Sequence, residues 1–118
     1  MLSLEHEPFL HIRHKVAGRP SVTDIALALE YALQHDDVPI LWDLRDLEPD
    51  QDIWVLGASQ LLPVVEDRRS RMSLNKRAFV VADVQADQGI AGMLERLHVP
   101  WPWGVFRDLS SALTWLAE

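Results

Sequence analysis

Acidic side chains cluster in one segment that follows an apolar run, where carboxylates could bind a metal ion. Asp43, Asp46, Glu48, Asp50 and Asp52 lie in this segment, and Asp83 closes a second apolar run. Ligands of open α/β sheets bind beyond the carboxyl ends of the strands, so Asp43 and Asp83 would share one crevice. Two or three carboxylates there could hold Mg²⁺ for hydrolysis. The alternative, which we favour, is that these residues turn the chain and that Asp52 caps a helix.

Other candidates for catalysis or metal binding do not complete a site. His11 and His14 are three apart, which places them on opposite faces of a strand, whereas zinc ligands must converge. Ser59 lacks the flanking glycines of a nucleophile elbow and falls within a helical stretch. The glycines of Gly89–Gly92 match no phosphate-binding or dinucleotide pattern and instead favour close packing of a helix on a sheet. We therefore expect a protein that is not an enzyme and has no resident metal or cofactor.

Basic side chains are concentrated in Arg68–Arg77, which holds five of the eleven lysines and arginines. One interpretation is a docking patch for an acidic protein, a phosphoinositide-like head group or RNA. The other, which we favour, is a solvated loop in which Arg68 and Arg69 complement a helix C-terminus. The net charge of -7 also repels nucleic-acid phosphates over most of the molecule. We expect no nucleic-acid partner.

Two tryptophans stand between prolines in Val99–Gly104. Tryptophan is enriched in interface hot spots and in apolar ligand pockets. We expect Trp103 to lie in a strand and in the core. An exposed Trp101 would mark a surface for a partner or a ligand.

The length and the amino-acid composition are those of one globular domain spanning residues 1–118. The chain has 48% apolar and 25% charged residues and no cysteine, which excludes disulfides and cysteine-based metal sites. It has neither a stretch of about 18 apolar residues nor the basic and apolar start of a secretory signal. We therefore expect a cytoplasmic protein.

Periodicity and end signals predict the elements that position these residues. Alternation over Phe9–Val16 is typical of a half-buried strand, with Leu2–Glu7 as its hairpin partner. Unbroken apolar runs predict strands buried on both faces at Val38–Trp42, Arg77–Ala82 and Trp103–Phe106. Helices are predicted at Val22–Gln34, capped by Ser21 and Asp24; at Gln51–Leu62, ended or kinked by Pro63; at Asp87–Leu97; and after Asp108. The order ββαβαβαβα predicts a single α/β domain with a mixed, mostly parallel sheet and about four helices.

The laid-out pattern resembles the STAS superfamily, in the branch similar to SEC14-type lipid-binding domains. The resemblance lies in the starting hairpin and in four segments: Val16-Ala17-Gly18, Ser21-x-Thr23-Asp24, Ile40–Arg45, and Val105–Asp108 with the ending Ala112-Leu113-x-Trp115-Leu116. It implies a regulatory domain like the antagonists of anti-sigma factors. Those proteins are switched by a phosphorylated serine at the start of the second helix. Here no serine or threonine occurs from Asp43 through Gly57, so we do not expect such a switch.

The sequence thus favours a non-enzymatic regulatory or protein-interaction domain with an unknown protein partner. Its interaction surface would comprise Asp43, Arg45, Asp46, Asp50, Asp52, Asp83 and Trp101. The first alternative is a carrier of a small apolar molecule or lipid, with a pocket lined by Trp54, Met93 and Trp101. A metal-dependent hydrolase built on Asp43 and Asp83 is the second. Exposed tryptophans and an unprotected edge strand would also favour a homodimer.

Overall fold

The expected alternation of strands and helices is confirmed in the computed structural model, which describes residues 11–48 and 53–118, without the side chains of residues 55 and 56. The elements are β1 (Ile12–Lys15), α1 (Val22–Gln34), β2 (Ile40–Asp43), α2 (Ile53–Arg68), a 3-10 turn (Arg69–Arg71), β3 (Arg77–Val80), α3 (Val84–Leu97), β4 (Trp103–Phe106) and α4 (Leu109–Ala117). The four strands form one sheet in the order β1-β2-β3-β4, and every described pair is parallel. The predicted hairpin partner, Leu2–Glu7, lies outside the described residues.

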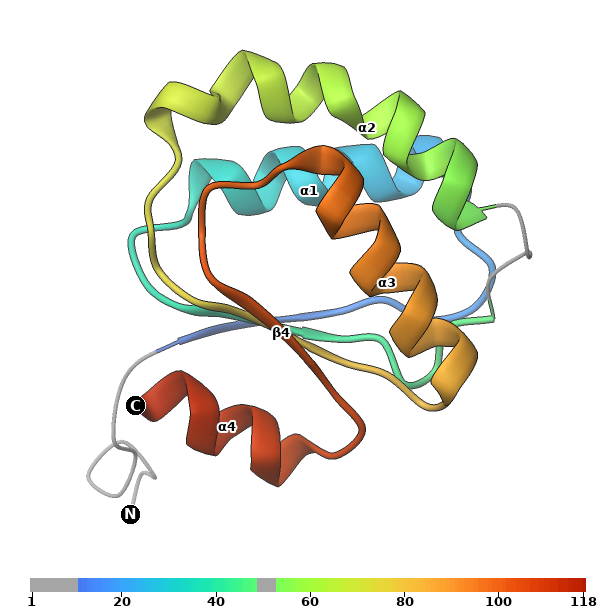
Figure 1. Ribbon diagram of the computed structural model, residues 1–118, viewed down its shortest axis with the longest axis vertical. Coiled ribbons are helices and arrows are strands. Elements are labelled where there is room, and N and C mark those ends of the chain that lie inside the picture. The colour runs from blue at the N-terminus through green and yellow to red at the C-terminus, as the bar shows by residue number, and fades with distance from the viewer. Residues whose placement is uncertain (1–10, 49–52) are drawn as a thin grey trace.

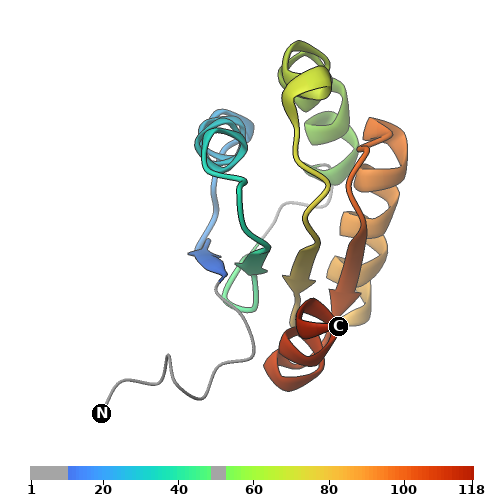
Figure 2. The ribbon, with the colours of Figure 1, turned by 90° about the vertical axis from the view of Figure 1, so that its left-hand side faces the viewer.

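Helices cover the two faces of the sheet unequally (Figures 1 and 2). Helices α1, α2 and α3 lie on one face, and α4 lies on the other. Side chains along a strand alternate between faces, and β2 follows this rule: Ile40 and Trp42 join the core beneath α1–α3, whereas Leu41 packs with α4. The larger of the two cores therefore lies under three helices.

Helix starts follow the predicted capping chemistry. The Ser21 hydroxyl accepts from the Asp24 amide at 3.1 Å, and the Asp24 carboxylate accepts from the Ser21 amide at 3.0 Å, which completes a capping box. Asp108 caps α4 by accepting from the Ser111 amide at 2.8 Å. Asp83 caps α3 in the same way, so this helix begins at Val84 rather than at the predicted Asp87.

Helix α2 continues past the proline that was predicted to end or kink it. Pro63 lies inside the helix, which ends at Arg68 instead of Leu62. A proline removes one helical hydrogen bond, but Leu61 and Val65 on either side of it are almost fully buried. Burial of these neighbours offsets the lost bond, because tertiary packing supplies most of the stability of such helices.

The basic stretch is helical at its start and strand at its end, and several of its side chains pair with other segments, which corrects its interpretation as a wholly solvated loop. Its first residues end α2 and form the 3-10 turn. Arg69 does complement a helix C-terminus, but that of α3, where it donates to the carbonyl oxygens of Leu97 and His98. Arg77 is 1% exposed and forms an ion pair with Asp36 at 3.2 Å. These residues consequently fasten neighbouring elements to one another.

Candidate ligand-binding cavity

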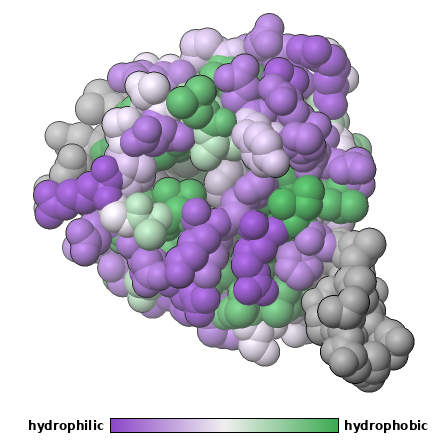
Figure 3. All heavy atoms as spheres, turned by 180° about the vertical axis from the view of Figure 1, so that it is seen from behind, coloured by the Kyte–Doolittle hydropathy of each residue, from purple (hydrophilic) through white to green (hydrophobic). Residues whose placement is uncertain are grey.

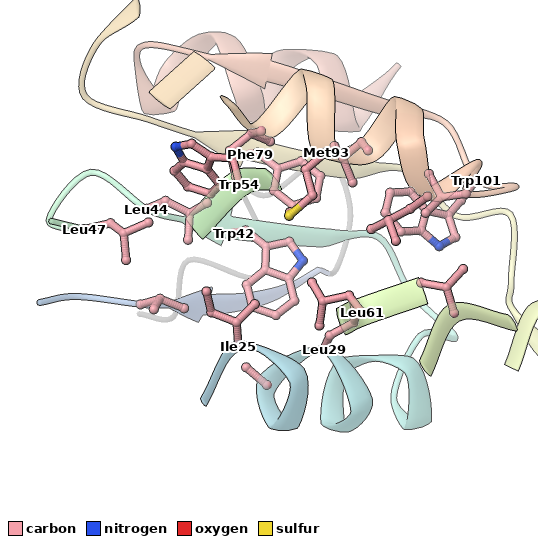
Figure 4. A pocket seen from close by; sticks show the side chains of 17 residues that line it. Ile25, Leu29, Trp42, Leu44, Leu47, Trp54, Leu61, Phe79, Met93 and Trp101 are labelled. Atoms are coloured by element: carbon pink, nitrogen blue, oxygen red, sulfur yellow. The ribbon is translucent and has the colours of Figure 1, made fainter. Parts of the chain in front are cut away.

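An apolar cavity of about 80 Å³ lies between the sheet and helices α1, α2 and α3 (Figure 4). The side chains that line it come from all three helices, from β2 and β3, and from the connecting segments. They are Val16, Ile25, Ala28, Leu29, Trp42, Leu44, Leu47, Trp54, Leu61, Val65, Phe79, Ile90, Met93, Leu94, Leu97, Val99 and Trp101. Every one of these seventeen side chains is apolar or an indole. Trp54, Met93 and Trp101, which the sequence suggested for a pocket, all line this one cavity.

Three aromatic rings extend along the sheet side of the cavity. Trp42 of β2 and Phe79 of β3 lie opposite one another in the strand register and stack with their centroids 6.4 Å apart and their planes within 2°. Phe79 also stacks on Trp101, with centroids 6.3 Å apart. Paired aromatic rings are stiff and bury a large area. They therefore give the cavity a firm apolar wall.

A tight contact between α2 and α3 sets one end of the cavity. The Trp54 ring of α2 lies against Gly89 of α3, where an added Cβ would come within 2.4 Å of the indole. Only glycine allows this approach. The glycine therefore serves packing against a neighbouring helix rather than the predicted packing on the sheet.

Among the side chains that line the cavity, the indole N–H groups of the tryptophans are the ones that can donate a hydrogen bond. The Nε1 atom of Trp101 is buried and has no hydrogen-bond partner among residues 11–48 and 53–118. Trp101 as a whole is 4% exposed, so its expected role as an exposed partner surface is wrong. Trp103, which was expected in the core, lies in β4 and is half-buried.

The volume of the cavity fits a small guest. About 10–15 Å³ on this measure holds one water molecule, so 80 Å³ equals the space of several waters or of a small ring. Pockets for drug-sized ligands are several times larger. A long lipid chain would therefore extend beyond this space, which is partly open to solvent.

A second aromatic group borders the cavity on the side of α1. The His14 ring lies 4.7 Å from that of Trp42 and edge-on to Tyr31 at 6.0 Å, and Tyr31 lies 4.6 Å from His35. Burial lowers the pKa of His14, and the nearby charge of His35 lowers it further. His14 is thus half-buried among aromatic side chains, within the strand predicted for it.

The acidic residues of the expected interaction surface have structural partners. Asp43 is 5% exposed and accepts two hydrogen bonds, each 2.9 Å long, from the guanidinium of Arg45. These bonds lower the pKa of the Asp43 carboxyl. Asp46 forms an exposed ion pair with Lys15 at 3.0 Å, and Asp83 caps α3. Asp50 and Asp52 lie outside the described residues.

Residues 11–48 and 53–118 do not bring three of the suggested carboxylates together. Within the described part of the chain, no three histidine, aspartate or glutamate residues lie close enough together to hold a metal ion. Asp43 is bound to Arg45, and the Asp83 carboxylate accepts from the backbone amide of Ala86 at 2.8 Å. Asp43 thus lies at the end of its strand as the alternative interpretation expected, Asp83 caps a helix, which was not predicted, and the predicted cap Asp52 lies outside the described residues. Among the described residues, none of the helices is long and apolar enough to cross a membrane.

Comparison with known proteins identifies the fold. No protein-family model matches the chain, and neither does any curated protein sequence. Among solved structures, the chain is similar to an uncharacterised protein of the DUF3478 family from Shewanella loihica PV-4, described as having a SpoIIAA-like fold. The two share 20% sequence identity and a TM-score of 0.55, over 88% of this chain and 82% of the other. The predicted STAS-like fold is thereby confirmed.

Proposed function

We propose that this STAS-like domain binds a small, predominantly apolar molecule in the cavity beneath α1, α2 and α3. The observation that carries the proposal is the lining itself, in which seventeen apolar or aromatic side chains surround about 80 Å³. Protein interiors are normally packed without voids larger than a water molecule, whereas this space is larger and partly open to solvent. An unfilled cavity costs stability because its lining loses dispersion contacts, and a bound apolar guest restores them.

The residues first assigned to a protein-interaction surface favour ligand binding over protein binding. Asp43 and Arg45 neutralise each other, Asp83 serves as a helix cap, and Trp101 is buried. In the same structure, Trp54, Met93 and Trp101 meet around one space. The pocket residues therefore converge on one site, whereas the acidic side chains are occupied by contacts with groups near them in the chain.

The proposal is tested with a variant whose larger side chain fills the cavity, and toluene is the probe ligand. Ala28 lines the cavity from α1, and Ala28→Leu would place three further carbons there. Ala117→Leu is the matched control, because Ala117 is exposed at the end of α4 on the opposite face of the sheet. Toluene binding is measured by NMR titration of each protein, and circular dichroism checks that each is folded.

We expect toluene to bind the wild-type protein and the Ala117→Leu control equally. Ala28→Leu should weaken binding at least about fivefold, because steric overlap with the ligand costs about 1–3 kcal/mol. Equal binding by both variants would place the ligand elsewhere. Failure of toluene to bind the wild-type protein would contradict the proposal.

A non-enzymatic regulatory domain that binds a cytoplasmic protein partner is the second candidate. The SpoIIAA-like fold of the neighbouring structure favours it, as do exposed apolar side chains on α1, Leu27 and Tyr31. The face shown in Figure 3 is largely hydrophilic, with separate apolar groups rather than one broad apolar area. Affinity purification with charge-reversed Asp46 tests this candidate. Loss of a captured protein on charge reversal supports it, and an unchanged capture excludes the acidic segment.

A homodimer is tested by light scattering, where a monomer mass at high concentration would reject it.

A further inference from the structure

Strand β4 forms one edge of the described sheet, and β1 forms the other. Alternate residues of an edge strand turn their backbone groups toward the inner neighbour, and the residues between them turn theirs outward. In β4 the carbonyl oxygens of Pro102 and Phe106 accept from amides of the β3 segment, each at 2.9 Å. The backbone N–H and C=O groups of Trp103 and Val105 therefore point outward.

The outer edge of β4 is open within the described part of the chain. β3 is the strand that pairs with β4 there, and no described strand lies on its other side. Figure 1 shows β4 in front of the other strands, and neither α3 nor α4 passes across it. Proline often protects an edge by removing a donor, but Pro102 lies at a position that turns toward β3. The outward donors are thus retained.

Charge distinguishes the two edges of the sheet. In β1 the amides of Ile12 and Val16 donate to the β2 segment, so Arg13 and Lys15 are the outward residues, and both are exposed. Charged side chains discourage the pairing of an edge strand. Antiparallel pairing of β1 with a second copy would also place Arg13 opposite Lys15, and like charges opposite one another are destabilising. The segment Trp103–Phe106 has no charged side chain and lacks this protection.

The sequence of β4 suits antiparallel pairing with itself. With a two-fold axis at Gly104, Trp103 of each copy lies opposite Val105 of the other, and such outward residues exchange two hydrogen bonds in each pair. Both side chains are half-buried against the larger core, so pairing would cover more of their apolar surface. An aromatic side chain opposite a β-branched one is a favourable cross-strand pair. At the axis, Gly104 would face Gly104 with no side chains between the two backbones.

We propose that β4 pairs antiparallel with β4 of a second copy of this chain, which joins the two sheets into one. Edge pairing of a short strand buries little area, so the association is weak and depends on protein concentration. The apolar cavity beneath α1, α2 and α3 is a separate feature, and its ligand binding does not depend on this contact.

The masses of three proteins across a concentration series, measured by sedimentation equilibrium, test the proposal. Val105→Pro removes one outward donor of β4. Leu27→Lys is the control, because Leu27 is an apolar side chain on α1 that is 62% exposed. The wild-type protein and Leu27→Lys should approach twice the chain mass at the highest concentration, whereas Val105→Pro should keep the mass of one chain. Circular dichroism checks that each variant is folded.

Hydrogen exchange of the wild-type amides identifies the edge without a variant, and it decides the question if Val105→Pro does not fold. The Trp103 and Val105 amides should exchange at least about tenfold more slowly where about nine-tenths of the protein is dimeric, because exchange then requires dissociation. The Arg13 and Lys15 amides, on the opposite edge, should exchange at the same rate at every concentration.

A wild-type protein that keeps the mass of one chain at every concentration would overturn the proposal. So would a dimer in which the exchange of the Trp103 and Val105 amides does not change with concentration. Loss of the dimer in Leu27→Lys but not in Val105→Pro would place the contact on α1 and would equally overturn the assignment to β4.

Discussion

Replacing Gly89 by alanine should have opposite effects on stability depending on whether Trp54 is present. An alanine Cβ at position 89 would lie 2.4, 2.5 and 2.6 Å from three atoms of the Trp54 indole. Ordinary contact begins at 3.4 Å, so the ring must retreat by about 1.0 Å (3.4 less 2.4). Such overpacking typically costs about 1–3 kcal/mol, and it is partly offset because alanine favours a helix over glycine by about 1 kcal/mol.

The expected net change for Gly89→Ala alone is therefore a loss of about 0–2 kcal/mol in the free energy of unfolding. In a Trp54→Ala background the clash is gone, and the same substitution should stabilise the protein by about 1 kcal/mol. Urea denaturation of the four proteins in this double-mutant cycle gives a coupling energy, expected at about 1–3 kcal/mol. Equal effects of Gly89→Ala in the two backgrounds would refute the contact between Trp54 and Gly89. The displaced ring should also alter toluene binding, because Trp54 lines the cavity.

Three further predictions concern buried or half-buried charges. Arg77→Met should destabilise the protein by about 3–5 kcal/mol because Asp36 loses its partner. Adding Asp36→Asn should recover part of the loss. Equal stability of the single and double variants would contradict the pairing. The pKa of His14 is lowered on folding, so its contribution to stability is present above the ordinary histidine pKa and is lost as the pH falls below it; chemical denaturation should show a smaller loss of stability between about pH 6.5 and 5 in His14→Phe, and an unchanged pH profile would refute this. The Asp43 pKa is lowered by Arg45, so its contribution is present above about pH 4 and lost as the pH falls through the folded-state pKa; Asp43→Asn should flatten the acid limb of the stability curve, and an acid limb identical to that of the wild-type protein would argue against the pair.

Local patterns were sufficient to predict most of the fold. The alternation around His14 identified β1, and the side-chain caps Ser21 and Asp108 located the starts of two helices. These signals involve residues a few positions apart, so they can be recognised without knowledge of tertiary contacts. The element order then led to the STAS-like fold, which the structural comparison confirms.

The errors arose where distant segments meet. Helix α2 does not end at Pro63, one of the two predicted outcomes, because the neighbours of Pro63 are buried beneath the helix, and burial is not visible in the local sequence. Arg77 appeared to belong to a solvated basic stretch, because its partners Asp36 and Trp101 are far away in the chain. The burial of Trp101 has the same origin.

The candidate site was predictable in part. Trp54, Met93 and Trp101 could be named as pocket residues from their types and places on predicted elements, and all three line the cavity. The aromatic wall of Trp42 and Phe79 was missed, because these residues read as ordinary members of buried strands. The parallel register that places them opposite each other is a property of the assembled sheet.

The central claim is that an apolar ligand enters the cavity, and intermolecular nuclear Overhauser effects from bound toluene test it most directly. The account predicts cross-peaks from toluene to the Met93 methyl group and to Leu29, which both line the cavity. Exposed Leu27 and Leu74 serve as internal controls and should show none. Cross-peaks confined to these exposed leucines, or no bound toluene at all, would contradict the account.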